Sequence, residues 1–279
     1  MTPSFGLIIV GDEILSGKRT DKHLSKTIEL LSARGLSLSY ADYVGDDPAR
    51  ITSTLARAVQ AARERGEVIF SCGGIGATPD DHTRQCAARA LGVDLALHPE
   101  AKRLIQERMQ DVAREQGLPY EPEREDNIHR LNMGTFPIGT QIIPNPYNKI
   151  PGFSWQPEAK DKSVGGIYWL PGFPVMAWPM MEWVLDTRYA HLHSSQAYVE
   201  KSIIVLGSME ATLTPLMVDI EAQHPGIKVF SLPSVDHPQY GRHIELGVKG
   251  APEAVNAAYP ALLAGLHRFE YKLGPELVR

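Results

Sequence analysis

Apolar runs and helix-spaced apolar positions alternate along the first third of the chain. Apolar residues form a run over 5–10, alternate with polar ones over 36–44 and form a second run within 67–72, which predicts three strands. Between them, apolar residues recur every three or four positions over 24–35 and 51–66, and each pattern ends at a glycine, which predicts two helices. This order is typical of a three-layer α/β domain with a mostly parallel sheet.

The loop after the third predicted strand has the composition of a phosphate cradle. It carries three glycines, a threonine and an acidic pair: Gly73, Gly74, Gly76, Thr78, Asp80 and Asp81. Glycine lets the backbone approach an anion closely, and the free amides of a helix N-terminus point at it. The loop matches neither a Walker A motif nor the dinucleotide fingerprint. Carboxylates beside a phosphate indicate a metal or a reacting water between them. The alternative is an ordinary strand-to-helix turn capped by Asp80 or Asp81.

Two other loops carry carboxylates in corresponding positions. Asp12 and Glu13 follow the first predicted strand, and Asp46 follows the second. Loops at the carboxyl ends of parallel strands gather at one edge of a sheet, where such domains bind ligands. We therefore expect Asp12 or Glu13, Asp46 and the Asp80–Asp81 pair to surround one cleft.

The second half of the chain predicts a further strand and helix and then a separate small domain. A strand over 167–170 precedes a helix over 175–188, in which Pro179 should cause a bend or mark the true start. Residues 189–196 have the composition of a linker. Beyond it, a β-α-β-β-α pattern over 199–271 predicts a small α+β domain, whose last helix should be interrupted at Pro260. The expected domains are therefore 1–190 and 199–279.

Composition narrows the class of protein. The 279 residues are 43% hydrophobic and 22% charged, with a net charge of −5, which disfavours binding to nucleic acid or anionic membrane. Two cysteines, Cys72 and Cys86, form no Cys-x-x-Cys pair and indicate a reducing compartment without a zinc site. The first apolar run is too short for a signal peptide or membrane span, so we expect a cytoplasmic protein.

Several motifs in order give a resemblance to a known family. They are Gly11-Asp-Glu-Ile-Leu-Ser-Gly17, Val44-Gly-Asp-Asp47, Gly73-Gly-Ile-Gly-Ala-Thr-Pro-Asp-Asp81, Asn145-Pro146, Pro151-Gly-Phe153 and Leu170-Pro-Gly-Phe-Pro174. The chain resembles the N-terminal part of the competence/damage-inducible protein A (CinA) family, which is built on a molybdopterin-binding MogA/MoaB-like domain and a KH-like module. The family's C-terminal deamidase domain has no counterpart in the sequence, so we expect no deamidase activity.

The resemblance implies two functions. One is hydrolysis of the pyrophosphate in ADP-ribose or a similar dinucleotide, assisted by Mg²⁺, Mn²⁺ or Co²⁺ and by K⁺. The other is non-catalytic binding of molybdopterin or a nucleotide. The expected partner is a small nucleotide or pterin, and we expect a homo-oligomer. RNA binding through the KH-like module is disfavoured because the net charge of the chain is negative.

The resemblance also implies roles for particular residues. The catalytic candidates are Asp81, Asp46 and Asp80, and the metal ligands would be Asp81, Asp46 and Glu13. The candidate phosphate and ligand contacts are Gly11, Asp12, Glu13, Gly73, Gly74, Gly76, Thr78, Asn145, Lys149 and Gly172. The chain departs from the family pattern at Asn148-Lys149, where the lysine could add a cation for a phosphate, and at Val175-Met176, where a carboxylate is lost.

Overall fold

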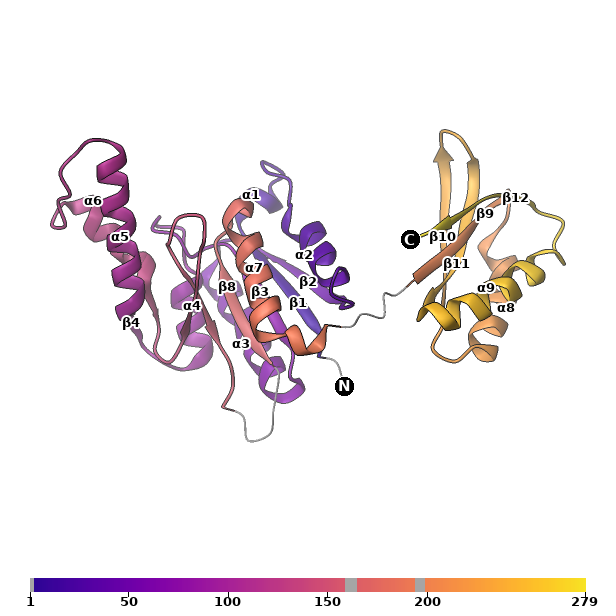
Figure 1. The fold of residues 1–279 in the computed structure, drawn as a ribbon, viewed down its shortest axis with the longest axis horizontal. Helices are drawn as coiled ribbons and strands as arrows, with labels where there is room; N and C mark the ends of the chain where they lie inside the picture. The colour runs from indigo at the N-terminus through magenta and orange to yellow at the C-terminus, as the bar shows by residue number, and fades with distance from the viewer. Residues whose placement is uncertain (1–2, 159–164, 194–198) are drawn as a thin grey trace. The chain divides into compact units, whose positions relative to one another are not determined.

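The computed structural model describes residues 3–158, 165–193 and 199–279 (Figure 1). Contacts between Cα atoms divide the chain into Met1–His193 and Ser194–Arg279. The first unit is an α/β domain and the second is a small α+β domain. Within the described ranges, no helix is long and apolar enough to cross a membrane.

The main sheet of the first domain has six strands in the order β2-β1-β3-β8-β7-β6. Four neighbouring strands are parallel, namely β2 (Leu38–Val44), β1 (Phe5–Val10), β3 (Val68–Cys72) and β8 (Gly166–Leu170). Two short strands, β7 (Gly152–Trp155) and β6 (Gln141–Ile143), extend the sheet in antiparallel fashion. The expected mostly parallel sheet is confirmed. The sequence analysis missed β7 because it follows directly on a turn-rich segment.

The register of the parallel strands brings their carboxyl ends to the same edge. Val10 pairs with Val44, and Cys72 pairs with Leu170. The ladder continues one residue beyond the strands, since Gly11 N donates to Val44 O at 3.0 Å and Gly73 N donates to Leu170 O at 3.0 Å. The loops that follow β1, β2, β3 and β8 therefore leave the sheet side by side.

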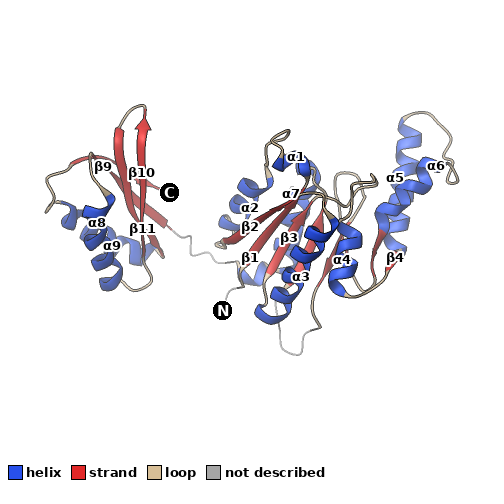
Figure 2. Cartoon of the chain, turned by 180° about the vertical axis from the view of Figure 1, so that it is seen from behind, coloured by secondary structure: helices blue, strands red, loops and turns tan. Residues whose placement is uncertain are grey.

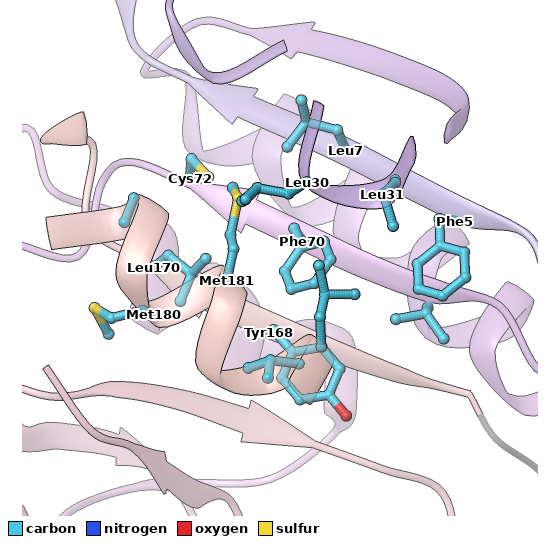
Figure 3. Close-up of a cluster of buried hydrophobic side chains, with 14 of the residues drawn as sticks. Phe5, Leu7, Leu30, Leu31, Phe70, Cys72, Tyr168, Leu170, Met180 and Met181 are labelled. Atoms are coloured by element: carbon cyan, nitrogen blue, oxygen red, sulfur yellow. The ribbon is translucent and has the colours of Figure 1, made fainter. Parts of the chain in front are cut away.

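Helices cover both faces of this sheet (Figure 2). On one face lie α2 (His23–Ser32) and α7 (Pro174–Arg188), and on the other lie α3 (Pro48–Arg65) and α4 (Thr83–Leu91). Figure 3 shows part of the first core, where Leu30, Leu31 and Met181 from the helices meet apolar side chains of the strands. The three-layer arrangement follows because each sheet face presents its own apolar set.

Further elements lie outside these layers. The short α1 (Asp12–Leu15) follows β1, and β4 (Leu95–Leu97) pairs with β5 (Thr135–Pro137). Two helices, α5 (Pro99–Glu115) and α6 (Glu125–Leu131), and a 3₁₀ segment at Asn132–Gly134 connect β4 to β5, and a second 3₁₀ segment follows α7 at Ala190–Leu192.

Two details of the sequence analysis differ at the end of this domain. Pro179 does not mark the start of the helix, because α7 runs without interruption from Pro174 to Arg188. Residues that follow Pro179 pack into the core, and this packing outweighs one missing hydrogen bond. Tyr189 does not begin a linker either. It is 1% exposed, packs edge-on against Phe5 and shares a 2.8 Å hydroxyl hydrogen bond with Tyr168. Ala190–Leu192 form a 3₁₀ turn, and the last part of the expected linker, 194–196, lies outside the described residues.

The second domain contains one strand more than expected. Its elements are β9 (Val199–Leu206), α8 (Glu210–Gln223), β10 (Lys228–His237), β11 (Gly241–Gly250), α9 (Pro252–Leu266) and β12 (Lys272–Val278). They form an antiparallel sheet in the order β10-β11-β9-β12, against which α8 and α9 pack. The unexpected strand β12 has only sparse apolar residues and is defined by its pairing with β9. Contrary to expectation, α9 continues through Pro260.

Candidate functional site

The loop after β3 is shaped by two glycines that no other residue could replace without strain. Gly73 has φ +108°, and a Cβ there would lie 2.1 Å from Val10 O. Gly74 has φ +68°, and a Cβ there would lie 2.2 Å from Thr83 Oγ1. The loop is closed by Thr83 N, which donates to Gly74 O at 2.9 Å. The backbone therefore turns sharply from β3 into the approach to α4, in a conformation that requires glycine.

The acidic pair does not cap α4. The N-cap position is His82, without a side-chain hydrogen bond to the helix. Instead, Asp81 Oδ2 accepts from Thr78 N at 2.8 Å and from Thr78 Oγ1 at 2.5 Å. A Cβ on Gly76 would lie 2.5 Å from the same oxygen, so the absence of a side chain there makes room for the carboxylate. The helix-cap alternative is thus wrong, and Asp81 stabilises the Thr78–Asp81 turn.

The first and second loops are joined by a reciprocal pair of hydrogen bonds. Asp12 N donates to Asp46 Oδ2 at 2.9 Å, and Asp46 N donates to Asp12 Oδ1 at 3.1 Å. Gly45 is required beside them, because a Cβ there would lie 2.4 Å from Asp12 Oδ1. Each backbone amide compensates the charge of the other residue's carboxylate.

Negative charge is concentrated around Asp46. Burial raises the pKa of Asp46, the backbone N–H of Asp12 partly offsets this, and the charges of Asp12, Glu13 and Asp80 raise the pKa further. Asp80 and Glu13 are therefore close enough to act on the Asp46 carboxylate, although they come from different loops. A carboxylate with a raised pKa at a cleft is a candidate functional group.

The loops enclose a cleft of 770 Å³ at the carboxyl edge of the main sheet. Most of the residues proposed from sequence line it, namely Gly11, Glu13, Asp46, Gly73, Gly74, Gly76, Thr78, Asp80, Asp81, Asn145 and Gly172. As expected, carboxylates from three loops therefore surround one glycine-lined cleft. Asp12 does not line the cleft; it lines a second hollow of 640 Å³ together with Glu13, Asp46 and Asp80.

Lys149 is not brought into the cleft. Its ammonium group donates to Asp111 Oδ2 at 2.6 Å and lies 4.0 Å from Glu107, both on α5. Lys149 has φ +66°, and its N–H donates to Asn145 O at 3.0 Å, so a tight turn directs the side chain away. The expected phosphate contact at this position is wrong.

Asn145 and Gly172 line the cleft with their polar groups already engaged. Asn145 Nδ2 donates to Asn148 Oδ1 at 2.8 Å and to Ile150 O at 2.9 Å, and its Oδ1 accepts from Tyr147 N at 3.0 Å. Gly172 O lies 3.0 Å from His23 Nε2. These residues set the shape of the wall, and the side chain of Asn145 keeps its loop closed.

Several cleft residues were missed by the sequence analysis. Lys18 and Arg19 line the cleft from the first loop, and neither makes a side-chain ion pair with any residue that the structure describes. The cleft is also lined by four apolar residues, Met133, Ile150, Phe173 and Met176. The signal for the two cations was their place next to Gly17 in the first loop. The signal for Phe173 was its position within the Leu170–Pro174 motif.

The described side chains alone do not make a metal site. Within 3–158, 165–193 and 199–279, no three histidines, cysteines or carboxylates are arranged to hold an ion. Mg²⁺, however, is commonly held by one or two carboxylates together with substrate phosphates. Asp46 and Asp80 supply two carboxylates, which fits an ion of that kind.

The fold and the cleft define a class of protein, an α/β domain with a glycine-lined cleft at the carboxyl edge of its sheet. The chain belongs to the family described as probable molybdopterin binding domain, which matches residues 6–191. A protein of Pyrobaculum arsenaticum is 30% identical over 231 residues, covering 81% of this chain and 78% of that protein.

Two further comparisons concern CinA. A CinA-like protein of Gloeobacter violaceus is 33% identical over 159 residues, which cover 57% of this chain and 34% of that protein. The crystal structure of CinA of unknown function from Thermoplasma acidophilum matches with a TM-score of 0.52 and 24% identity, over 67% of this chain and 98% of that chain. The resemblance to the CinA family and the expected fold class are both confirmed.

Proposed function

We propose that the cleft binds a small phosphorylated heteroaromatic molecule, either a molybdopterin or a nucleotide. The observation that carries this proposal is that one cleft is lined both by the glycine loop with two cations and by exposed apolar side chains. Lys18 and Arg19 lie without ion-pair partners among the described residues, in the same cleft as the glycine loop. Phe173, which is 55% exposed, lies in that cleft with Met133 and Met176.

A phosphate group suits the glycine loop and the two cations. Backbone amides of a glycine loop can approach an anion closely, and two cations offset its charge against the nearby carboxylates. Phe173 and the methionines suit a flat ring, because stacking on an aromatic side chain contributes roughly 1–3 kcal/mol for a nucleobase. A ligand that carries both groups matches the family description as a molybdopterin-binding domain.

Calorimetric titration tests this proposal with AMP, ADP-ribose and isolated molybdopterin as ligands. Pyrophosphate serves as a comparison ligand that has no ring. Phe173→Ala should weaken AMP binding by about tenfold while leaving pyrophosphate binding unchanged, since only the ring contact is lost. Lys18→Gln should weaken both. The matched controls are Val175→Ala, an exposed neighbour of Phe173 outside the cleft, and Lys102→Gln, an exposed lysine on α5. Absence of binding of all three ligands to the wild type would overturn the proposal.

A second candidate function is hydrolysis of the pyrophosphate bond of ADP-ribose or a dinucleotide. The observation that favours it is that Asp46 and Asp80 both line the cleft and that burial raises the pKa of Asp46, because a carboxylate of this kind is a candidate general base. A divalent ion held by Asp80 and the ligand's phosphates would neutralise phosphate charge, and Asp46 would accept a proton from the water that attacks the pyrophosphate bond. The glycine loop would hold the phosphates so that the pyrophosphate bond lies beside Asp46.

Release of AMP from ADP-ribose and FAD, with Mg²⁺, Mn²⁺ or Co²⁺, tests the second candidate. Asp46→Asn should retain ligand binding and lose about 10²-fold or more in turnover, as expected for loss of an acid–base group. Binding of ADP-ribose by the wild type without any release of AMP would contradict hydrolysis and leave binding as the function.

A further inference from the structure

A second cavity lies behind the loop that carries the acidic pair. Its volume is 240 Å³, and it shares Ala77, Thr78 and Asp81 with the cleft. Its remaining polar lining comes from the start of α4 and from the segment near β5, namely His82, Arg84, Gln85, Asn132 and Thr135. The 77–81 segment is thus a wall between two hollows, of which only one has been considered as a ligand site.

Arg84 is the charged residue that distinguishes this cavity. It is 5% exposed, and its Nη1 donates to Ile75 O at 2.6 Å. No other hydrogen bond of its guanidinium group is made to a described residue, and no described carboxylate lies within ion-pair distance. Burial lowers the pKa of Arg84, and the charge of Asp81 opposes this only in part.

Such an arrangement is costly unless a further partner is present. A buried cation normally has a carboxylate or several acceptors, because desolvation of an unpaired charge is unfavourable by several kcal/mol. The guanidinium group has five N–H donors in a planar fork that matches carboxylate or phosphate oxygens. Here one protein carbonyl uses a single donor, and the side chain lines a cavity with other polar groups.

We propose that this cavity is an anion site that binds a phosphate group through Arg84. The remaining guanidinium donors would contact the phosphate oxygens, and Asn132, Thr135 and His82 would supply further hydrogen bonds from the lining. The site lies at the N-terminus of the nine-residue helix α4, whose dipole favours an anion. The phosphate is either the free ion or a phosphate monoester. The proposal does not depend on the function proposed for the cleft.

Calorimetric titration with inorganic phosphate, at constant ionic strength in chloride, tests the assignment. Arg84→Lys keeps the charge but loses the fork, and it should weaken phosphate binding at this site by about tenfold or more. The matched control is Arg89→Gln, which removes an arginine from the exposed side of α4, outside both cavities, and should change nothing. Lys18→Gln reports on the cleft and should leave this site unchanged.

The number of sites separates this proposal from the one for the cleft. If both hold, the wild type binds two phosphates and Arg84→Lys retains one. If the cleft binds no phosphate, the wild type binds one and Arg84→Lys loses it. Phosphate binding that is unchanged in folded Arg84→Lys would overturn the assignment. AMP distinguishes the sources, because AMP binding weakened by Arg84→Lys indicates a monoester, while loss of phosphate binding alone indicates the free ion.

A measurement on the wild type keeps the test valid if the Arg84 variants fail to fold. Titration with phosphate should shift the NMR signals of the Asn132 and Gln85 side-chain amides and of the Thr135 backbone amide. Shifts confined to Gly73, Gly74 and Gly76 would place the anion in the cleft and overturn the assignment.

Discussion

Replacing Asp81 separates a role in holding its loop from a role in chemistry. One carboxylate oxygen, Oδ2, accepts from both the backbone N–H and the hydroxyl of Thr78. Asp81→Ala removes both hydrogen bonds. Asp81→Asn keeps an acceptor oxygen in the same place and removes only the charge. We expect the local bonding to be the main role of Asp81, because its bonded oxygen is directed at the turn.

The expected magnitudes follow from these two bonds. A hydrogen bond to a charged group contributes about 1.5–3 kcal/mol, and a neutral one about 1 kcal/mol. Because Asp81 is half-buried, the lower values apply, and Asp81→Ala should lower the free energy of unfolding by about 2 kcal/mol. Asp81→Asn should cost less than about 1 kcal/mol. For a domain of this size, these losses correspond to about 4–8 °C and less than about 4 °C in Tm.

Thermal unfolding and ligand assays on the same preparations provide the measurement. Asp81→Asn should retain affinity for ADP-ribose, and any release of AMP, within about threefold of the wild type. Gly76→Ala is the matched control, since its Cβ would lie 2.5 Å from Asp81 Oδ2 and displace the carboxylate without removing its charge. It should reproduce the loss of stability caused by Asp81→Ala. A folded Asp81→Asn protein with a wild-type Tm and about 10²-fold less turnover would refute this reasoning, since such a loss indicates a group acting on the transition state.

Three further predictions concern the loops of the cleft. Because the folded protein raises the pKa of Asp46 above 3.8, its charged form is disfavoured and stability falls as the pH rises through the folded-state pKa. In thermal melts at the two pH values, Asp46→Asn should therefore raise the Tm at pH 7 and lose this advantage at pH 3.5. Gly73→Ala should cost roughly 3 kcal/mol or more in urea unfolding, because a positive φ and a clash with Val10 O act together. Asp47→Ala should cost about 1 kcal/mol, since Asp47 Oδ1 caps α3 through Arg50 N, and Asp47→Ser should restore most of that loss in the same urea titration. A Gly73→Ala protein as stable as the wild type, or an Asp47→Ala protein without a loss, would contradict these assignments.

The sequence was sufficient where local chemistry decides the structure. Gly66 after the last turn predicted the end of α3, because a left-handed backbone position depends on the residue that occupies it. The convergence of Glu13, Asp46 and the glycine loop was also predictable. It follows from the rule that parallel strands end at a common edge, together with the apolar pattern that identified the strands.

The tertiary structure alone decided which side chains act in that cleft. Lys149 pairs with Asp111 on α5, while Lys18 and Arg19 line the cleft, although all three lie beside motif residues in predicted loops. Such a partner lies far away in the chain, so its presence depends on packing between elements. For the same reason the sequence predicted Asp81 as a helix cap or catalytic group, but only the fold joined it to Thr78. Local patterns fix the backbone, whereas the pairing of charges requires distances that only the folded chain defines.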